Sequence, residues 1–111
     1  MGILKEIGQG FTALNYEKLA PTVSTGITSS KLRNSVGIAA VAAFITTETA
    51  SINYTLDGTT PTNDAADAGH EMKADEQIII SGIEDLTKFR CIEKSAGNGA
   101  KVKVSVYFGT A

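Results

Sequence analysis

The sequence predicts an all-β domain, an antiparallel β-sandwich of about six to eight short strands. Short runs alternate between apolar and polar side chains, which is the period of a strand with one buried face. Turn residues punctuate these runs, and no strong helix interrupts them. Hydrophobic residues make up 42% of the chain, but aromatic residues make up only 6% of it and Trp is absent. Aliphatic side chains must therefore fill the space between thin sheets. At 111 residues the chain has the size of one domain with one core.

The clearest strand is close to the C-terminus. The segment 102–108 alternates Val, Val, Val and Phe with polar or amphipathic residues. The preceding run, 88–94, mixes apolar with charged residues, and the connection between the two contains Asn98-Gly99, which suits a turn with positive φ. We therefore expect these two runs to pair as a hairpin.

Further strands are expected upstream. Gln77 to Ser81 contains three consecutive isoleucines, which indicate a strand covered on both faces, and one turn of helix at 83–86 follows it. The alternation over 51–56 predicts a half-buried strand. The segment 41–47 is its expected hairpin partner across a short turn.

Three segments are harder to interpret. The four alanines of 35–43 favour a helix, but Gly37 and the β-branched residues favour a strand, which we predict. The segment 22–30 is rich in Thr, Ser and Gly and predicts a polar strand with turns. Residues 1–20 lack a clean period and are expected to form an N-terminal arm or edge strand, followed by a single β-sandwich domain over residues 21–111. Immunoglobulin-like and jelly-roll-like arrangements both fit these elements.

Composition argues against several classes of partner. Ten basic against twelve acidic residues give a net charge of −2, which lacks the positive surplus that nucleic acid requires. The longest apolar run, 36–45, has about half the length of a membrane span, and we expect it in the core. The single cysteine, Cys91, and a start without secretion-signal features predict synthesis and folding in a cytoplasm.

No arrangement of residues in the sequence supports catalysis or metal binding. Cys91 is expected to be a small buried thiol, and the only histidine, His70, lies in an acidic, Gly-rich segment. One Cys and one His are too few for a structural zinc site. The acidic stretch 57–76 lacks the regular spacing of a calcium loop and is expected to be solvated. We therefore predict a protein that is not an enzyme and has no cofactor.

The segment 53–62, Asn-Tyr-Thr-Leu-Asp-Gly-Thr-Thr-Pro-Thr, is the most distinctive in the chain. It predicts a strand that ends in a tight turn. Asp57 can accept hydrogen bonds from the backbone amides ahead of it, Gly58 can adopt positive φ, and Pro61 ends strand pairing. A structural turn explains this pattern more simply than a ligand site does.

This turn resembles one in chitobiase-like, immunoglobulin-like β-sandwich modules. About the last seventy residues, from Phe44 onward, also resemble small proteins of phage and prophage particle gene clusters. In that second group the Asp-Gly-Thr-x-Pro-Thr turn precedes an isoleucine-rich strand, an Ile-x-x-Leu-x-x-Phe-Arg segment and a valine-rich strand that ends in Tyr-Phe. Here these elements are residues 77–81, 83–90 and 104–108, whereas residues 1–20 match nothing in the pattern.

The resemblance implies a phage virion protein, a decoration or cement protein that binds the outer surface of the capsid. Its partner would be the major capsid protein, and a homotrimer fits the role, with neither nucleic acid nor a membrane involved. A tail, fibre or connector component and a carbohydrate-binding or adhesion module are the alternatives. The expected partner contacts are Phe11, Leu14, Tyr16, Asp57, Thr59, Thr60 and Thr62.

Overall fold

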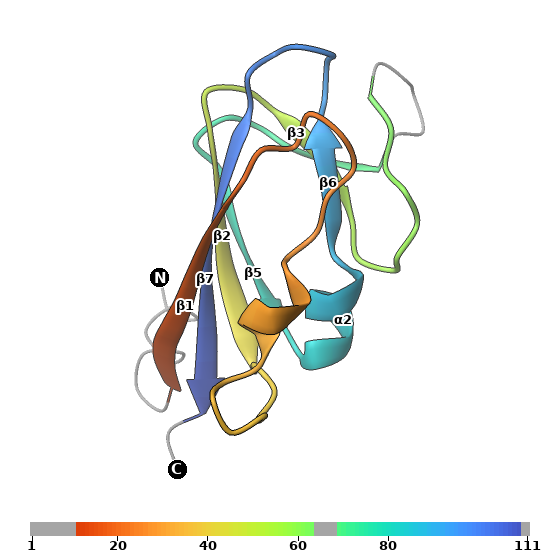
Figure 1. Ribbon diagram of the computed structural model, residues 1–111. Coiled ribbons are helices and arrows are strands. Elements are labelled where there is room, and N and C mark those ends of the chain that lie inside the picture. The colour runs from red at the N-terminus through yellow and green to blue at the C-terminus, as the bar shows by residue number, and fades with distance from the viewer. Residues whose placement is uncertain (1–10, 64–68, 110–111) are drawn as a thin grey trace.

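The protein is a sandwich of two antiparallel β-sheets, as a computed structural model describes it for residues 11–63 and 69–109 (Figure 1). Sheet A has the strand order β1-β7-β2-β5, and sheet B has the order β4-β3-β6. The prediction of an all-β antiparallel sandwich is therefore confirmed. The strands are β1 (Phe11–Leu19), β2 (Ala42–Glu48), β3 (Ile52–Thr55), β4 (His70–Met72), β5 (Gln77–Ser81), β6 (Arg90–Glu93) and β7 (Lys101–Gly109).

Sheet A is built around β7, which pairs with β1 on one side and β2 on the other. The alternation predicted for β7 is confirmed, because Val102, Val104 and Val106 are fully buried while the residues between them are not. The β1–β7 pairing shifts register between Ala13 and Asn15, as in a β-bulge. The shift leaves Leu14 outside the regular ladder.

Sheet B is smaller, and an irregular segment closes its edge at β6. The backbone N–H of Thr25 donates to the Cys91 carbonyl (2.9 Å), and the Cys91 N–H donates back to Thr25 (2.7 Å). The Glu93 N–H donates to the Pro21 carbonyl (2.7 Å). These bonds pair backbone groups of β6 that would otherwise be unpaired at an open sheet edge.

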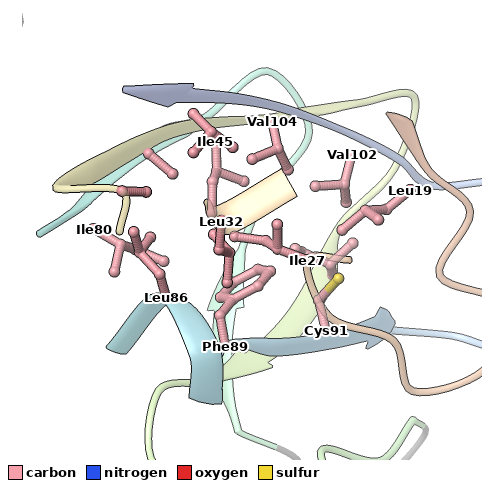
Figure 2. Close-up of a cluster of buried hydrophobic side chains, with 14 of the residues drawn as sticks. Leu19, Ile27, Leu32, Ile45, Ile80, Leu86, Phe89, Cys91, Val102 and Val104 are labelled. Atoms are coloured by element: carbon pink, nitrogen blue, oxygen red, sulfur yellow. The ribbon is translucent and has the colours of Figure 1, made fainter. Parts of the chain in front are cut away.

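The core lies between the two sheets, and two short helical elements close one end of it (Figure 2). The 3-10 turn η1 (Ser29–Leu32) contributes Leu32, and α2 (Ile83–Lys88) contributes Leu86. Phe89 follows α2 directly, and its ring lies among these side chains (Figure 2). Burying a side chain of this size stabilises the fold by about 1.5–3 kcal/mol, so the helical elements anchor the space between the sheets.

Both predicted hairpins are wrong, because the chain changes sheet at each of these connections. β2 and β3 lie in different sheets, as do β6 and β7. β2 pairs instead with β7, and β3 pairs with β6. The connection before β7 has the expected turn chemistry, with positive φ at Gly97 (75°) and Gly99 (79°), whereas the positive φ of Thr49 (76°) in the other connection was not expected of a β-branched residue. Their residues redirect the chain across the sandwich instead of folding it back within one sheet.

The strands predicted over 35–43 and 22–30 are wrong. Residues 33–39 form a loop closed by an isolated bridge between Arg33 and Ala39, and only the end of the first segment enters β2. The Asn34 side chain accepts hydrogen bonds from the amides of Val36 and Ile38 (3.0 and 2.9 Å), so these amides need no strand partner. In the second segment, Thr25 makes a single bridge, and η1 begins at Ser29.

β5 is a strand as predicted, but it is not covered on both faces. It is an edge strand of sheet A, and only Ile80 of its three isoleucines is fully buried. Both helical elements lie on the inner side of sheet A (Figure 1), so none of the described helices covers its outer face. The helical turn expected at 83–86 is confirmed by α2, which extends to Lys88.

Candidate protein-binding surfaces

The first predicted contact segment is strand β1 at the edge of sheet A. Leu14 and Tyr16, two large side chains of this strand, are 56% and 54% exposed. Leu19, at the end of the same strand, is buried against the core. Phe11 begins β1, but its side chain lies outside the described part of the structure, as do residues 1–10 of the predicted arm.

Tyr16 is one end of a row of side chains that crosses the outer face of sheet A. The strand register places Tyr16 opposite Ser105, Ser105 opposite Phe44, and Phe44 opposite Ile79. Side chains directly opposite in neighbouring strands share a face. Phe44 and Ile79 are half-buried, so the row presents partly exposed apolar surface on β2 and β5 and at Tyr16 on β1, with Ser105 of β7 as a polar position between them.

The turn η1 is tied to β1 by two side chains on the inner side of the strand. The Asn15 side-chain amide donates to the Lys31 carbonyl (2.8 Å). The Glu17 carboxylate accepts from the Thr28 backbone N–H (2.8 Å) and from the Thr28 hydroxyl. A groove of about 530 Å³ lies between β1 and residues 30–35. The hydrogen bonds hold the two walls of this groove together.

The second predicted contact segment is the turn after β3, and its predicted geometry is confirmed. The Asp57 carboxylate accepts from the Thr59 backbone N–H (2.9 Å), Gly58 has φ of 88°, and Pro61 is buried. The hydrogen bond from Thr59 lowers the pKa of Asp57. Asn53 donates from beneath the turn to the Thr62 carbonyl (3.0 Å). Forming the turn is a structural role that explains why these residue types occur here, and it requires no bound ligand.

The structure does not bring the two predicted contact segments together. Asp57, Thr59, Thr60 and Thr62 are exposed, but their turn extends from sheet B. Figure 1 shows this green turn and the red-brown β1 on opposite sides of the molecule. A flat partner surface therefore cannot contact both segments at once.

Sequence reasoning missed two features beside β1. Val36 and Ile38, in the loop stabilised by Asn34, are 77% and 58% exposed, although they were expected in the core. Asn34 followed by Gly37 was the available turn signal, since Asn and Gly favour such loops. The cations Lys31 and Arg33 both line the groove, and no sequence spacing predicted this because their neighbour Asn15 is remote along the chain.

The row Cys91, Tyr54 and His70 is the arrangement closest to a catalytic pair. Tyr54 lies between the other two in the strand register, and its ring centroid is 5.5 Å from that of His70. Two strand spacings separate Cys91 from His70 by about 10 Å, beyond hydrogen-bonding distance. Burial raises the pKa of the Cys91 thiol to about 12, an effect that the Arg90 charge only partly opposes. This thiol is a core side chain, as the sequence predicted.

The acidic stretch 57–76 is only partly described, because Asp64 and Asp67 lie outside the described residues. Within the described ranges, no three His, Cys, Asp or Glu side chains are grouped closely enough to hold a metal ion. Glu71 forms an ion pair with Lys94 (2.9 Å). In the same part of the chain, no helix has the length and apolar character to cross a membrane.

Comparisons of the chain with protein-family models, with curated proteins and with solved structures found no match.

Proposed function

We propose that this chain is a non-catalytic structural protein of a phage particle, a decoration or cement protein that binds the outer surface of the capsid and stabilises it. The observation that carries the proposal is the exposure of Leu14 and Tyr16 at the edge of sheet A, together with the half-buried Phe44 and Ile79 on the outer face of the same sheet. The resemblance of the 53–62 turn and of the C-terminal pattern to small phage particle proteins supports the same role.

A sandwich of this size can offer only a limited patch to a partner. A standard interface buries about 800 Å² on each partner, and weaker contacts bury less. On a symmetric shell, however, many copies bind equivalent sites, and contacts between neighbouring copies would add to each other through multivalency. A two-sheet domain with exposed apolar side chains at one edge fits this mode of binding.

The test uses particles that lack the protein, to which purified protein is added back. The double variant Leu14→Ser with Tyr16→Ser should bind these particles at least about tenfold more weakly, because it removes one aliphatic and one aromatic anchor. Val23→Ser is the matched control, since Val23 is 68% exposed in the segment that closes sheet B. Deleting residues 1–20 is a poorer test, because Leu19 is buried and β1 is part of sheet A.

Electron cryomicroscopy of the same particles locates the protein. Regular added density on the outer capsid is the expected result. Density confined to the tail or a connector, or binding of the wild-type protein to glycans but not to shells, would overturn the proposal in favour of the alternatives. Equal shell binding by the double variant and the control would overturn the assignment of β1 as the contact.

A further inference from the structure

β1 is the longest strand edge that the structure leaves open. β7 occupies one side of the strand, whereas on the other side none of the described segments forms backbone hydrogen bonds to it. The edge at β6, in contrast, is closed by residues 21–25. After the irregularity at Leu14, the section from Asn15 to Leu19 pairs regularly with β7. Five such residues give an edge about 17 Å long that another strand could join.

The groove beside this edge is lined by two cations and by no carboxylate, and Glu17, two residues from Asn15 on the same face of β1, has its carboxylate hydrogen-bonded to Thr28. The groove is lined by Leu14 and Asn15 from β1 and by residues from the 30–35 segment, which include Lys31 and Arg33 but no carboxylate. The ion pairs of the described residues join other lysines to glutamates and leave both of these cations out. Among the described residues, the Arg33 guanidinium donates only to the Gly37 carbonyl (3.2 Å). The groove therefore favours a negatively charged group.

Strand β1 provides both the open edge and one wall of the groove, so the position of the groove relative to the edge is fixed. The Asn15 side chain is directed to the groove, since it donates to the Lys31 carbonyl and lines the cavity. On an added strand, the residue directly opposite Asn15 would present its side chain to the same face. That side chain would enter the groove, while its backbone would pair with β1.

From this geometry we propose that the β1 edge and its groove form a docking site for an extended segment of another protein that carries an acidic side chain. The segment adds to sheet A as a fifth strand beside Asn15–Leu19, and its Asp or Glu carboxylate lies between Lys31 and Arg33. Backbone hydrogen bonds provide affinity, and the charged groove provides specificity for an acidic side chain. This inference is independent of the proposed particle role, because it specifies the chemistry of the segment and not its source.

The test measures binding of short peptides to the 15N-labelled full chain by chemical-shift titration. The probe is a capped seven-residue peptide of alternating Thr and Val with a central Glu, compared with the same peptide carrying a central Gln or Lys. The expected shifts map to β1 and to residues 30–35, and the Glu peptide should bind about threefold to tenfold more tightly than the Gln peptide. The Lys peptide should bind most weakly.

Two controls separate backbone pairing from charge. N-methylation of alternate peptide amides removes hydrogen-bond donors and should abolish binding in one of the two alternations. The variant Lys31→Gln with Arg33→Gln should lose the preference for Glu, whereas Lys73→Gln with Lys101→Gln, which removes equal charge from exposed positions elsewhere, should keep it. Equal affinity for all three peptides, shifts outside β1 and the groove, or no shifts at millimolar peptide would overturn the proposal. Dimerisation through β1 without peptide would also overturn it, because a second copy would then occupy the edge.

Discussion

Gly26→Ala tests whether the irregular segment beside β6 is an integral part of sheet B. A Cβ at Gly26 would lie 2.5 Å from the Phe89 carbonyl oxygen, a backbone atom that cannot rotate away. The segment would have to move outward by about 0.9 Å or more to reach an ordinary contact distance. Such a movement would stretch both backbone hydrogen bonds between Thr25 and Cys91.

The expected decrease in the free energy of unfolding can be worked out from the groups that move. Each weakened hydrogen bond accounts for about 0.5–1.5 kcal/mol. Partial exposure of Ile27, which is buried in the core, adds about 1 kcal/mol. Together these effects lower the free energy of unfolding by about 2–4 kcal/mol, which corresponds to a decrease in Tm of roughly 8–20 °C for a domain of this size.

Gly97→Ala provides the matched control. Gly97 has φ of 75°, and a methyl group added there would have no neighbouring atom within 4 Å, so this variant has backbone strain without a clash. Its cost should be about 1–2 kcal/mol. Urea unfolding measures both free energies, and amide hydrogen exchange at Cys91 and Glu93 should increase only in Gly26→Ala. A Gly26→Ala protein within about 0.5 kcal/mol of wild type, with unchanged exchange, would show that the segment is not an integral part of sheet B.

Three further predictions concern single side chains. With a pKa of about 12 instead of the usual 9.0, the Cys91 thiol should react with a thiol reagent at pH 8 at least roughly a thousandfold more slowly in the folded protein than in urea; rapid native labelling would contradict its burial. Hydrogen bonding and charge from Lys103 lower the pKa of Glu48, so its stabilising effect is present above the usual value of 4.5 and is lost as the pH falls through the lowered value. Acidification from pH 7 to pH 3 should therefore destabilise wild type more than Glu48→Gln in denaturant titrations, and equal pH profiles would oppose this. Asn34→Ala should speed amide exchange at Val36 and Ile38 with a global loss of about 1 kcal/mol, whereas unchanged exchange would show that the loop does not depend on this side chain.

The strands themselves could be predicted because their signal is local. The alternation in β7 and the isoleucine run in β5 each depend on neighbouring residues only. Strand partners could not be predicted in the same way, because a short connection such as that after Glu48 permits either a hairpin or a change of sheet. The bonds that fix the outcome, such as the Lys94 amide to the Ser51 carbonyl (3.0 Å), join residues far apart in the sequence.

The candidate surfaces also divide into features that local sequence predicts and features that contacts between distant residues determine. The exposed Leu14 and Tyr16 lie in a segment whose mixed pattern already suggested an edge strand or arm. The cationic groove beside them depends on the hydrogen bond from Asn15 to the Lys31 carbonyl, which holds η1 against β1. These two residues are sixteen positions apart, and no sequence motif predicts their contact. Val36 and Ile38 were misplaced for the opposite reason, since hydropathy alone predicted burial where a side-chain hydrogen bond fixes an exposed loop.

The central position of β7 has a consequence for how the protein folds during synthesis. β7 holds β1 and β2 in one sheet, yet it follows every other strand of the described chain. Until residues 101–109 leave the ribosome, β1 has no neighbour in sheet A and one edge of β2 lacks its hydrogen-bonding partner. The sandwich therefore closes only after translation of its last strand, and this dependence on long-range pairing places its folding in the millisecond-to-second range typical of β-sandwiches.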